Sequence, residues 1–210
     1  MKSLFAGVAL LCAAVGPVVG GTFPWRGPAP GGEPHPATVA LRDYTATLRT
    51  NLGDIALRFE PDAAPNAVRM FVKLAERGSY DGARIYCVFK DRMVIAGTPP
   101  SGAKVADGET AAYEDTPQSV TAGSVLVDRA ADGRNCPGRL LIVLADQAHL
   151  DGDYTVFAEV TAGLDVAKRI GSVATRPADG SPAPIEEIVI EQALVAKKPS
   201  PGAKETDTKK

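Results

Sequence analysis

Short runs with a two-residue hydrophobic period dominate the middle of the chain. In residues 54–59, the large apolar side chains Ile55, Leu57 and Phe59 occupy every second position, as in a strand with one buried face. A run at 45–50 precedes them, and Asn51-Leu52-Gly53 between the two runs favours a hairpin turn. Further strands are predicted at 84–89, 93–96, 124–127, 140–144, 155–160 and 185–190.

Two segments show a helical period instead. Within residues 61–78 one helical face carries four apolar residues, namely Val68, Phe71, Leu74 and Ala75. Pro65 suits the first turn of this helix and Gly78 its C-terminal cap. A second short helix is predicted at 164–170, closed by Gly171. Many short strands with two helices predict a mainly β fold, a barrel capped at its ends.

The first twenty residues have the pattern of a secretory signal peptide. Lys2 provides a positive charge, residues 4–19 are apolar, and Val18-Val19-Gly20 supplies small residues for cleavage. The apolar run of about 16 residues is shorter than the ~20 that a spanning helix needs. We therefore expect export, to the periplasm or the medium, without stable membrane insertion after cleavage.

Composition divides the remaining chain into three parts. Residues 21–43 are rich in Gly and Pro, which predicts an extended linker. Residues 44–194 carry the strand and helix patterns of one folded domain. Residues 195–210 are polar and predict a disordered tail.

Charge and residue counts exclude several classes of function. The net charge of −2 and the absence of a basic cluster argue against nucleic acid as a partner. His35 and His149 are the only histidines, too few for a His-rich metal site or a Ser-His-Asp triad. We expect a monomer with neither metal nor cofactor.

Several motifs in the predicted domain resemble the cyclophilin-type peptidyl-prolyl isomerases. They agree with that family in order and spacing over about residues 45–192: TNLGDI at 50–55, APN at 64–66, YDG at 80–82, HLDGDYTVF at 149–157 and GLDV at 163–166. The resemblance implies a closed eight-stranded antiparallel β-barrel with a helix at each end. It also implies an outer groove that binds X-Pro segments of proteins and speeds rotation about the X-Pro bond without a cofactor.

The same alignment implies that the catalytic position has changed. After the YDG turn the family reads FHRVIPGFMIQGGDP, and this chain reads IYCVFKDRMVIAGTP at 85–99. Cys87 therefore occupies the position of the catalytic arginine, so no catalytic residue is assigned. Arg92 replaces a pocket phenylalanine, and Ile95 replaces a glutamine that orients the substrate.

The second half of the implied groove has changed as well. The family's GSQFFI becomes PGRLLI at 137–142, so that Arg139 replaces a substrate-binding glutamine and Leu141 a pocket phenylalanine. Four residues, Met93, His149, Leu150 and Tyr154, match the family pattern. The substrate-binding residues implied by the resemblance are thus Arg92, Met93, Ile95, Arg139, Leu141, His149, Leu150 and Tyr154.

A cysteine cannot supply the fixed cation of an arginine. Removing one aimed electrostatic donor typically costs about 10²–10³-fold in rate, which predicts a weak isomerase. A non-catalytic peptide-binding or chaperone module is the alternative. Two arginines, Arg92 and Arg139, are near enough in sequence to reach the groove, and the alternative for both is a surface position covering its rim.

Strand alternation predicts that Cys87 faces the groove with Ile85 and Phe89, opposite Tyr86 and Val88. The resemblance also implies that the segment around Cys136 runs near this position. A disulfide between Cys87 and Cys136 and two separate thiols therefore both remain open. A redox-sensitive thiol at Cys87 is a further alternative.

Overall fold

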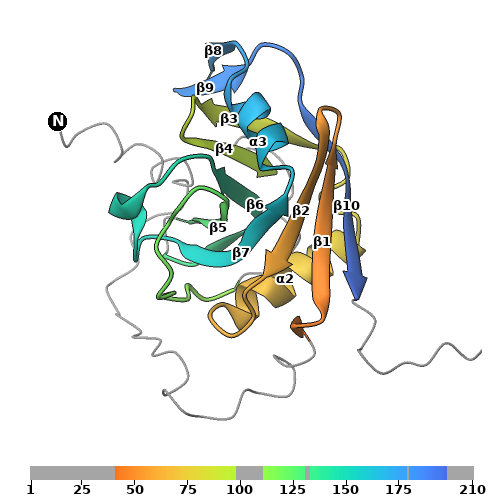
Figure 1. The fold of residues 1–210 in the computed structure, drawn as a ribbon, viewed down its shortest axis with the longest axis vertical. Helices are drawn as coiled ribbons and strands as arrows, with labels where there is room; N and C mark the ends of the chain where they lie inside the picture. The colour runs from red at the N-terminus through yellow and green to blue at the C-terminus, as the bar shows by residue number, and fades with distance from the viewer. Residues whose placement is uncertain (1–40, 98–110, 131–132, 179, 198–210) are drawn as a thin grey trace, which may run out of the picture.

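Antiparallel pairing closes the predicted strands into a barrel (Figure 1). The computed structural model describes residues 41–97, 111–130, 133–178 and 180–197. The barrel strands in these residues are β1 (Tyr44–Thr50), β2 (Gly53–Phe59), β3 (Ala83–Phe89), β4 (Met93–Gly97), β5 (Ser124–Arg129), β6 (Asn135–Val143), β7 (Thr155–Ala162) and β10 (Val189–Lys197). Their order around the barrel is β1-β10-β3-β4-β6-β5-β7-β2.

Two α-helices accompany the barrel in the described residues, α2 (Pro65–Glu76) and α3 (Leu164–Gly171). Figure 1 shows α2 at the lower end of the barrel and α3 towards the upper end. The predicted class, a mainly β fold with a closed eight-stranded antiparallel barrel and two helices, is confirmed.

The main core lies inside the barrel and beneath α2. Aromatic rings occupy its centre: the ring centroid of Phe71 on α2 lies 5.5 Å from that of Phe59, 5.4 Å from that of Phe157 and 4.9 Å from that of Tyr80. Such tilted and offset contacts suit the charge distribution of aromatic rings. The helical period of α2 thus delivers one apolar face to the open end of the barrel.

The N-terminus of α2 is capped from a distant segment. Ala64 provides no side-chain cap, but the carboxylate of Glu114 accepts hydrogen bonds from the backbone N–H groups of Asn66 (3.0 Å) and Ala67 (2.9 Å). Glu114 is fully buried, and its backbone bonds Thr155 on β7. Burial raises the pKa of this carboxyl group, whereas the two backbone hydrogen bonds act to lower it.

Helix α3 begins at a close approach to β2. Gly163 precedes the helix with φ +82°, and a Cβ atom there would lie 2.1 Å from the carbonyl oxygen of Asp54. Only glycine combines this left-handed backbone with that packing distance. At the other end Gly171 is the last helical residue, so the predicted boundary is off by one position.

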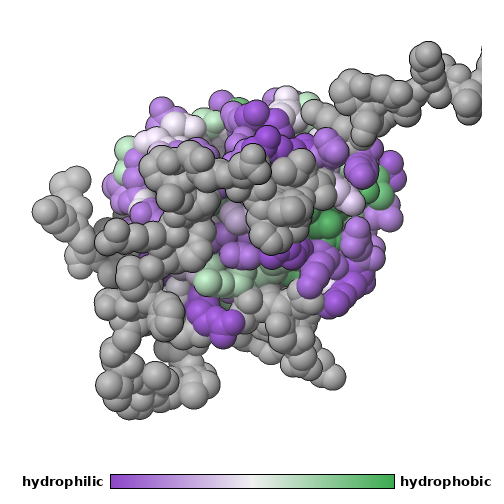
Figure 2. All heavy atoms as spheres, turned by 90° about the horizontal axis from the view of Figure 1, so that it is seen from below, coloured by the Kyte–Doolittle hydropathy of each residue, from purple (hydrophilic) through white to green (hydrophobic). Residues whose placement is uncertain are grey.

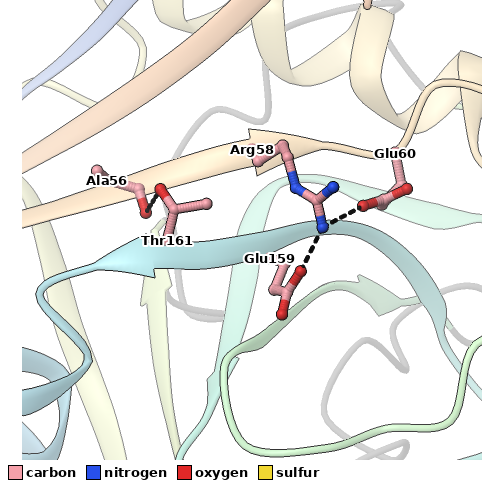
Figure 3. Close-up of polar contacts among 5 residues, drawn as sticks. All are labelled: Ala56, Arg58, Glu60, Glu159 and Thr161. Atoms are coloured by element: carbon pink, nitrogen blue, oxygen red, sulfur yellow. Dashed lines mark hydrogen bonds and ion pairs between the residues drawn. The ribbon is translucent and has the colours of Figure 1, made fainter.

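Strands β2 and β7 pair antiparallel in the barrel wall (Figure 3). The guanidinium of Arg58 lies between the carboxylates of Glu60 (3.2 Å) and Glu159 (2.6 Å). The side chains of Arg58 and Glu159 are about half exposed and that of Glu60 is 30% exposed, so the ion pairs contribute little stability. A hydrogen bond of 3.3 Å from the Thr161 hydroxyl to the Ala56 carbonyl joins the same strands.

The sequence pattern does not predict a small hairpin after α3, formed by β8 (Thr175–Ala178) and β9 (Ser181–Pro184). Its strands contain Pro177, Pro182 and Pro184, which oppose a strand prediction but are tolerated in a two-stranded ribbon. The hairpin packs against β3.

The last barrel strand also differs from the prediction. A strand is predicted at 185–190, but β10 begins at Val189, and Ile185 is 58% exposed. β10 continues to Lys197 because it pairs with β1 from Ile190 to its end. The folded unit therefore extends past the predicted limit at 194, and it includes Leu41, which is buried in the core.

The predicted signal peptide, the linker up to residue 40 and the tail from residue 198 lie outside the described residues. Among the helices that the structure describes, none is long and apolar enough to cross a bilayer. Seen from below, the visible coloured surface is mainly hydrophilic, with small hydrophobic areas (Figure 2).

Candidate functional site

A second apolar cluster lies on the outside of the barrel, over strands β3, β4, β6 and β5. Alternation separates it from the core: on β6, Leu140 and Ile142 belong to the interior, whereas Leu141 and Val143 belong to this second set. We call it the outer cluster. Its buried members are Cys87, Met93, Ile95, Val120, Leu126, Leu141, Val143, Leu150 and Val156, and the half-buried Tyr86, Phe89 and Tyr154 pack against it.

Strand pairing aligns the centre of the outer cluster. Cys87 on β3 faces Ile95 on β4, which faces Leu141 on β6, which in turn faces Leu126 on β5. Of the residues that the resemblance implies for substrate binding, Met93, Ile95, Leu141, Leu150 and Tyr154 all lie in this cluster or against it.

A β-bulge in β3 changes which side chains accompany Cys87. The pairing with β4 shifts between Ile85, opposite Ala96, and Cys87, opposite Ile95. Tyr86, at the shift, packs against the outer cluster together with Cys87, while Ile85 lies in the barrel core. The expectation that Ile85 shares a face with Cys87, and that Tyr86 lies opposite, is therefore wrong because the extra residue resets the alternation.

The thiol of Cys87 is buried against the β8–β9 hairpin. Cys87 is only 2% exposed, and Ser181 on β9 lies close enough to affect the pKa of its thiol. Burial raises the pKa of the thiol to about 11, although Ser181 acts to lower it. The group is thus neutral at physiological pH and provides no charge at the position where the resemblance implies an arginine.

An ion pair borders the outer cluster. Nη1 of Arg139 on β6 lies 3.0 Å from Oδ2 of Asp128 on β5, and both side chains are more than nine-tenths buried. Oδ1 of Asp128 accepts a hydrogen bond of 2.8 Å from the backbone N–H of Arg129. Burial raises the pKa of Asp128, and its bond to Arg139 opposes that rise.

Arg139 remains cationic in this position. Burial alone acts to lower the pKa of its guanidinium, but Tyr86, Cys136 and Asp128 outweigh that effect and raise it. Arg139 is therefore buried and not at the surface, whereas Arg92 is exposed in the turn between β3 and β4. His149 is also exposed, next to the buried Leu150 in the short 3-10 helix η1 (Ala148–Leu150).

Cys136 lies buried at the start of β6, and the structure forms no disulfide between it and Cys87. Both thiols lie close enough to Tyr86 to influence the pKa of its hydroxyl, which burial raises. Asp128, Tyr86 and Ser181 are the polar neighbours that sequence reasoning missed. The one available signal was the position of Asp128, which directly follows the apolar run Val125-Leu126-Val127.

Comparison with known proteins identifies the family. The family described as "Cyclophilin type peptidyl-prolyl cis-trans isomerase/CLD" matches residues 45–195. Peptidyl-prolyl cis-trans isomerase CYP18-2 of Arabidopsis thaliana is 32% identical over 148 residues, covering 69% of this chain and 88% of that protein. The protein belongs to the cyclophilin-type peptidyl-prolyl cis-trans isomerase family.

Other relatives agree with this assignment. Peptidyl-prolyl cis-trans isomerase-like 1 of Rhizopus delemar is 35% identical over 132 residues, covering 61% of this chain and 80% of that protein. A crystal structure of a Cryptosporidium parvum cyclophilin-type isomerase shares the fold, with a TM-score of 0.64 and 22% identity over 74% of this chain and 98% of that one.

Proposed function

We propose that this protein is a cyclophilin-type isomerase that acts on X-Pro bonds of protein segments at the outer cluster. The observation that carries the proposal is the gathering of Met93, Leu141, Leu150 and Tyr154, which come from different elements, into one apolar set outside the barrel core. A Cryptosporidium parvum relative was solved in the presence of the dipeptide Ala-Pro, which supports a proline-containing peptide as the ligand.

The outer cluster suits the chemistry of prolyl rotation. The planar amide is stabilised by resonance, and rotation of the C–N bond breaks that resonance. An apolar surface that holds the proline ring binds the twisted amide better than the more dipolar planar form. Such differential binding lowers the barrier without forming or breaking a covalent bond.

The activity is weak, because a neutral thiol stands where relatives of this type place a cation. Loss of one aimed donor costs about 10²–10³-fold in rate. The same neutral thiol favours the second candidate, a module that binds proline-containing segments without catalysis. Binding without rate enhancement supports that second function.

The decisive experiment is an isomerisation assay on purified protein with a proline peptide, in parallel with a binding measurement. Tyr154→Ala removes a half-buried ring from the outer cluster without opening the core, and Leu52→Ala, in the turn between β1 and β2, is the matched control. We expect Tyr154→Ala to weaken both rate and binding at least fivefold and Leu52→Ala to change neither. Equal effects of the two substitutions contradict the proposed site.

The proposal includes export. The charge, the apolar run and the small residues of 1–20 support cleavage near Gly20, so the mature chain starts near residue 21. Mass spectrometry of the protein recovered from outside the cytoplasm tests this, and an intact N-terminus on that protein contradicts it. We expect the mature protein to be a monomer, which light scattering tests.

A further inference from the structure

The β8–β9 hairpin brings X-Pro bonds of the protein itself to the proposed site. β9 consists of Ser181-Pro182-Ala183-Pro184, so it contains two X-Pro bonds in an extended strand. All four residues are half-buried, and part of each therefore remains in contact with solvent. An extended, proline-containing segment is also the kind of ligand proposed for the outer cluster, so β9 has the chemistry of a ligand.

Strand register places β9 near the Cys87 end of β3. β10 pairs antiparallel with the start of β3, and the N–H of Ile85 donates a hydrogen bond of 2.8 Å to the carbonyl of Ile188. Residues that precede Ile188 therefore lead along β3 towards Phe89. β9 ends four residues before Ile188 and packs against β3, beside which Figure 1 shows the hairpin.

The hairpin is attached to the barrel without a ladder of hydrogen bonds. β8 and β9 form a separate two-stranded sheet, and in the described part of the chain no backbone hydrogen bond joins β9 to β3. Pro182 and Pro184 have no N–H group, so half of the residues of β9 cannot donate to a neighbouring strand. The contact with β3 therefore depends on side chains, and releasing it breaks no strand pairing of the barrel.

This contact closes one side of the outer cluster. Cys87 belongs to that cluster and lies outside the barrel core, yet it is only 2% exposed. Ser181 is the hairpin residue that lies close to its thiol. Tyr154, which packs against the same cluster, remains half-buried. The hairpin thus covers the position where the resemblance implies the catalytic contact.

We infer that β9 is a detachable strap, which covers the Cys87 side of the outer cluster in the free protein and competes there with proline-containing segments of other proteins. The inference rests on the proposed function and describes its regulation. A ligand binds fully only to molecules with an open strap, so its apparent Kd exceeds the intrinsic value by the inverse of the open fraction. Local opening of this kind leaves the barrel folded.

The first test locks the strap. Ser181→Cys provides a second thiol beside Cys87, and oxidised glutathione converts the two thiols into a disulfide that ties β9 to β3. Cys136→Ala in the same mature chain prevents other pairings. We expect the oxidised protein to bind a proline peptide at least tenfold more weakly than the reduced protein. Cys136→Ala alone is the control, and its peptide Kd is the same before and after a reductant.

The second test loosens the strap. Pro182→Gly/Pro184→Gly gives β9 more backbone freedom, which raises the entropic cost of holding it against β3. We expect the peptide Kd to fall at least threefold and alkylation of Cys87 at pH 8 to become at least fivefold faster. Cys136 is buried in the same molecule and serves as the internal control, because an unchanged rate there shows that the barrel stays closed.

The outcomes separate the strap from the proposed function. Equal peptide Kd values for the locked and the reduced protein overturn the strap and leave the isomerase function standing. So does a glycine variant that neither binds more tightly nor exposes Cys87, and this variant decides where the disulfide does not form. If the glycine variant exposes both cysteines equally, it has lost its fold, and the locked protein decides. A reduced protein and a folded glycine variant that both bind no proline peptide overturn the proposed function.

Discussion

Replacing Cys87 with arginine is the most informative single change, because arginine is the residue that the resemblance implies for this position. In this structure the side chain at 87 is 2% exposed and packed against Ser181 of the hairpin. An arginine must either fit beneath β9 or displace it. It also adds a positive charge in the neighbourhood of Asp128, which is already paired with Arg139.

The magnitude follows from these contacts. A buried charge without its own partner destabilises a protein by about 3–5 kcal/mol, and overpacking typically adds about 1–3 kcal/mol. We expect Cys87→Arg to lower the free energy of unfolding by at least ~3 kcal/mol, a large share of the usual ~5–15 kcal/mol. With a urea m-value of about 1–3 kcal/mol/M, the midpoint falls by at least ~1 M. The isomerisation rate rises less than tenfold.

Urea titration followed by circular dichroism, together with the isomerisation assay, tests this. Cys87→Ser is the control, since it keeps the size of the side chain and adds no charge. A Cys87→Arg protein that keeps the wild-type urea midpoint and gains a hundredfold in isomerisation rate refutes the packing described for Cys87. That result shows that the β8–β9 hairpin moves aside at little cost in free energy.

Three further predictions concern other parts of the molecule. Glu114→Gln replaces the acceptor of two charge-assisted bonds to α2, so we expect a loss of about 1–3 kcal/mol in the free energy of unfolding by urea titration; an unchanged midpoint contradicts the capping role. The pKa of the Cys87 thiol is about 11 in the folded state, above the value of 9.0 for an ordinary thiol. The stability that the protonated, buried thiol contributes is therefore complete below pH 9 and is lost as the pH rises towards 11. Alkylation at pH 8 should accordingly be at least tenfold slower at Cys87 in the native protein than in urea, and equal rates argue against burial. Arg58→Gln should change stability by less than about 1 kcal/mol, because its ion pairs are exposed, and a larger loss in thermal unfolding contradicts that estimate.

Local patterns in the sequence determined most of the elements. The two-residue period at 54–59 and the helical period around Phe71 are properties of neighbouring residues, and they predicted β2 and α2 correctly. Motif spacing then indicated the family and the replacement at Cys87. These features needed no knowledge of contacts between distant segments.

Only the tertiary structure decided how the site is arranged. The bulge at Tyr86 depends on how β3 pairs with β4, and it moves Ile85 into the core against the local alternation. The burial of Arg139 depends on Asp128, eleven residues earlier on a neighbouring strand.

The same holds for two contacts over longer separations. Glu114 caps a helix 47 residues earlier in the chain, and the hairpin that carries Ser181 covers Cys87 on β3. Hydrophobic periodicity indicates which face of an element is buried, but it does not indicate which other segment packs against that face. Register, bulges and charge pairing arise when distant segments meet, because each is selected by the free energy of the assembled barrel.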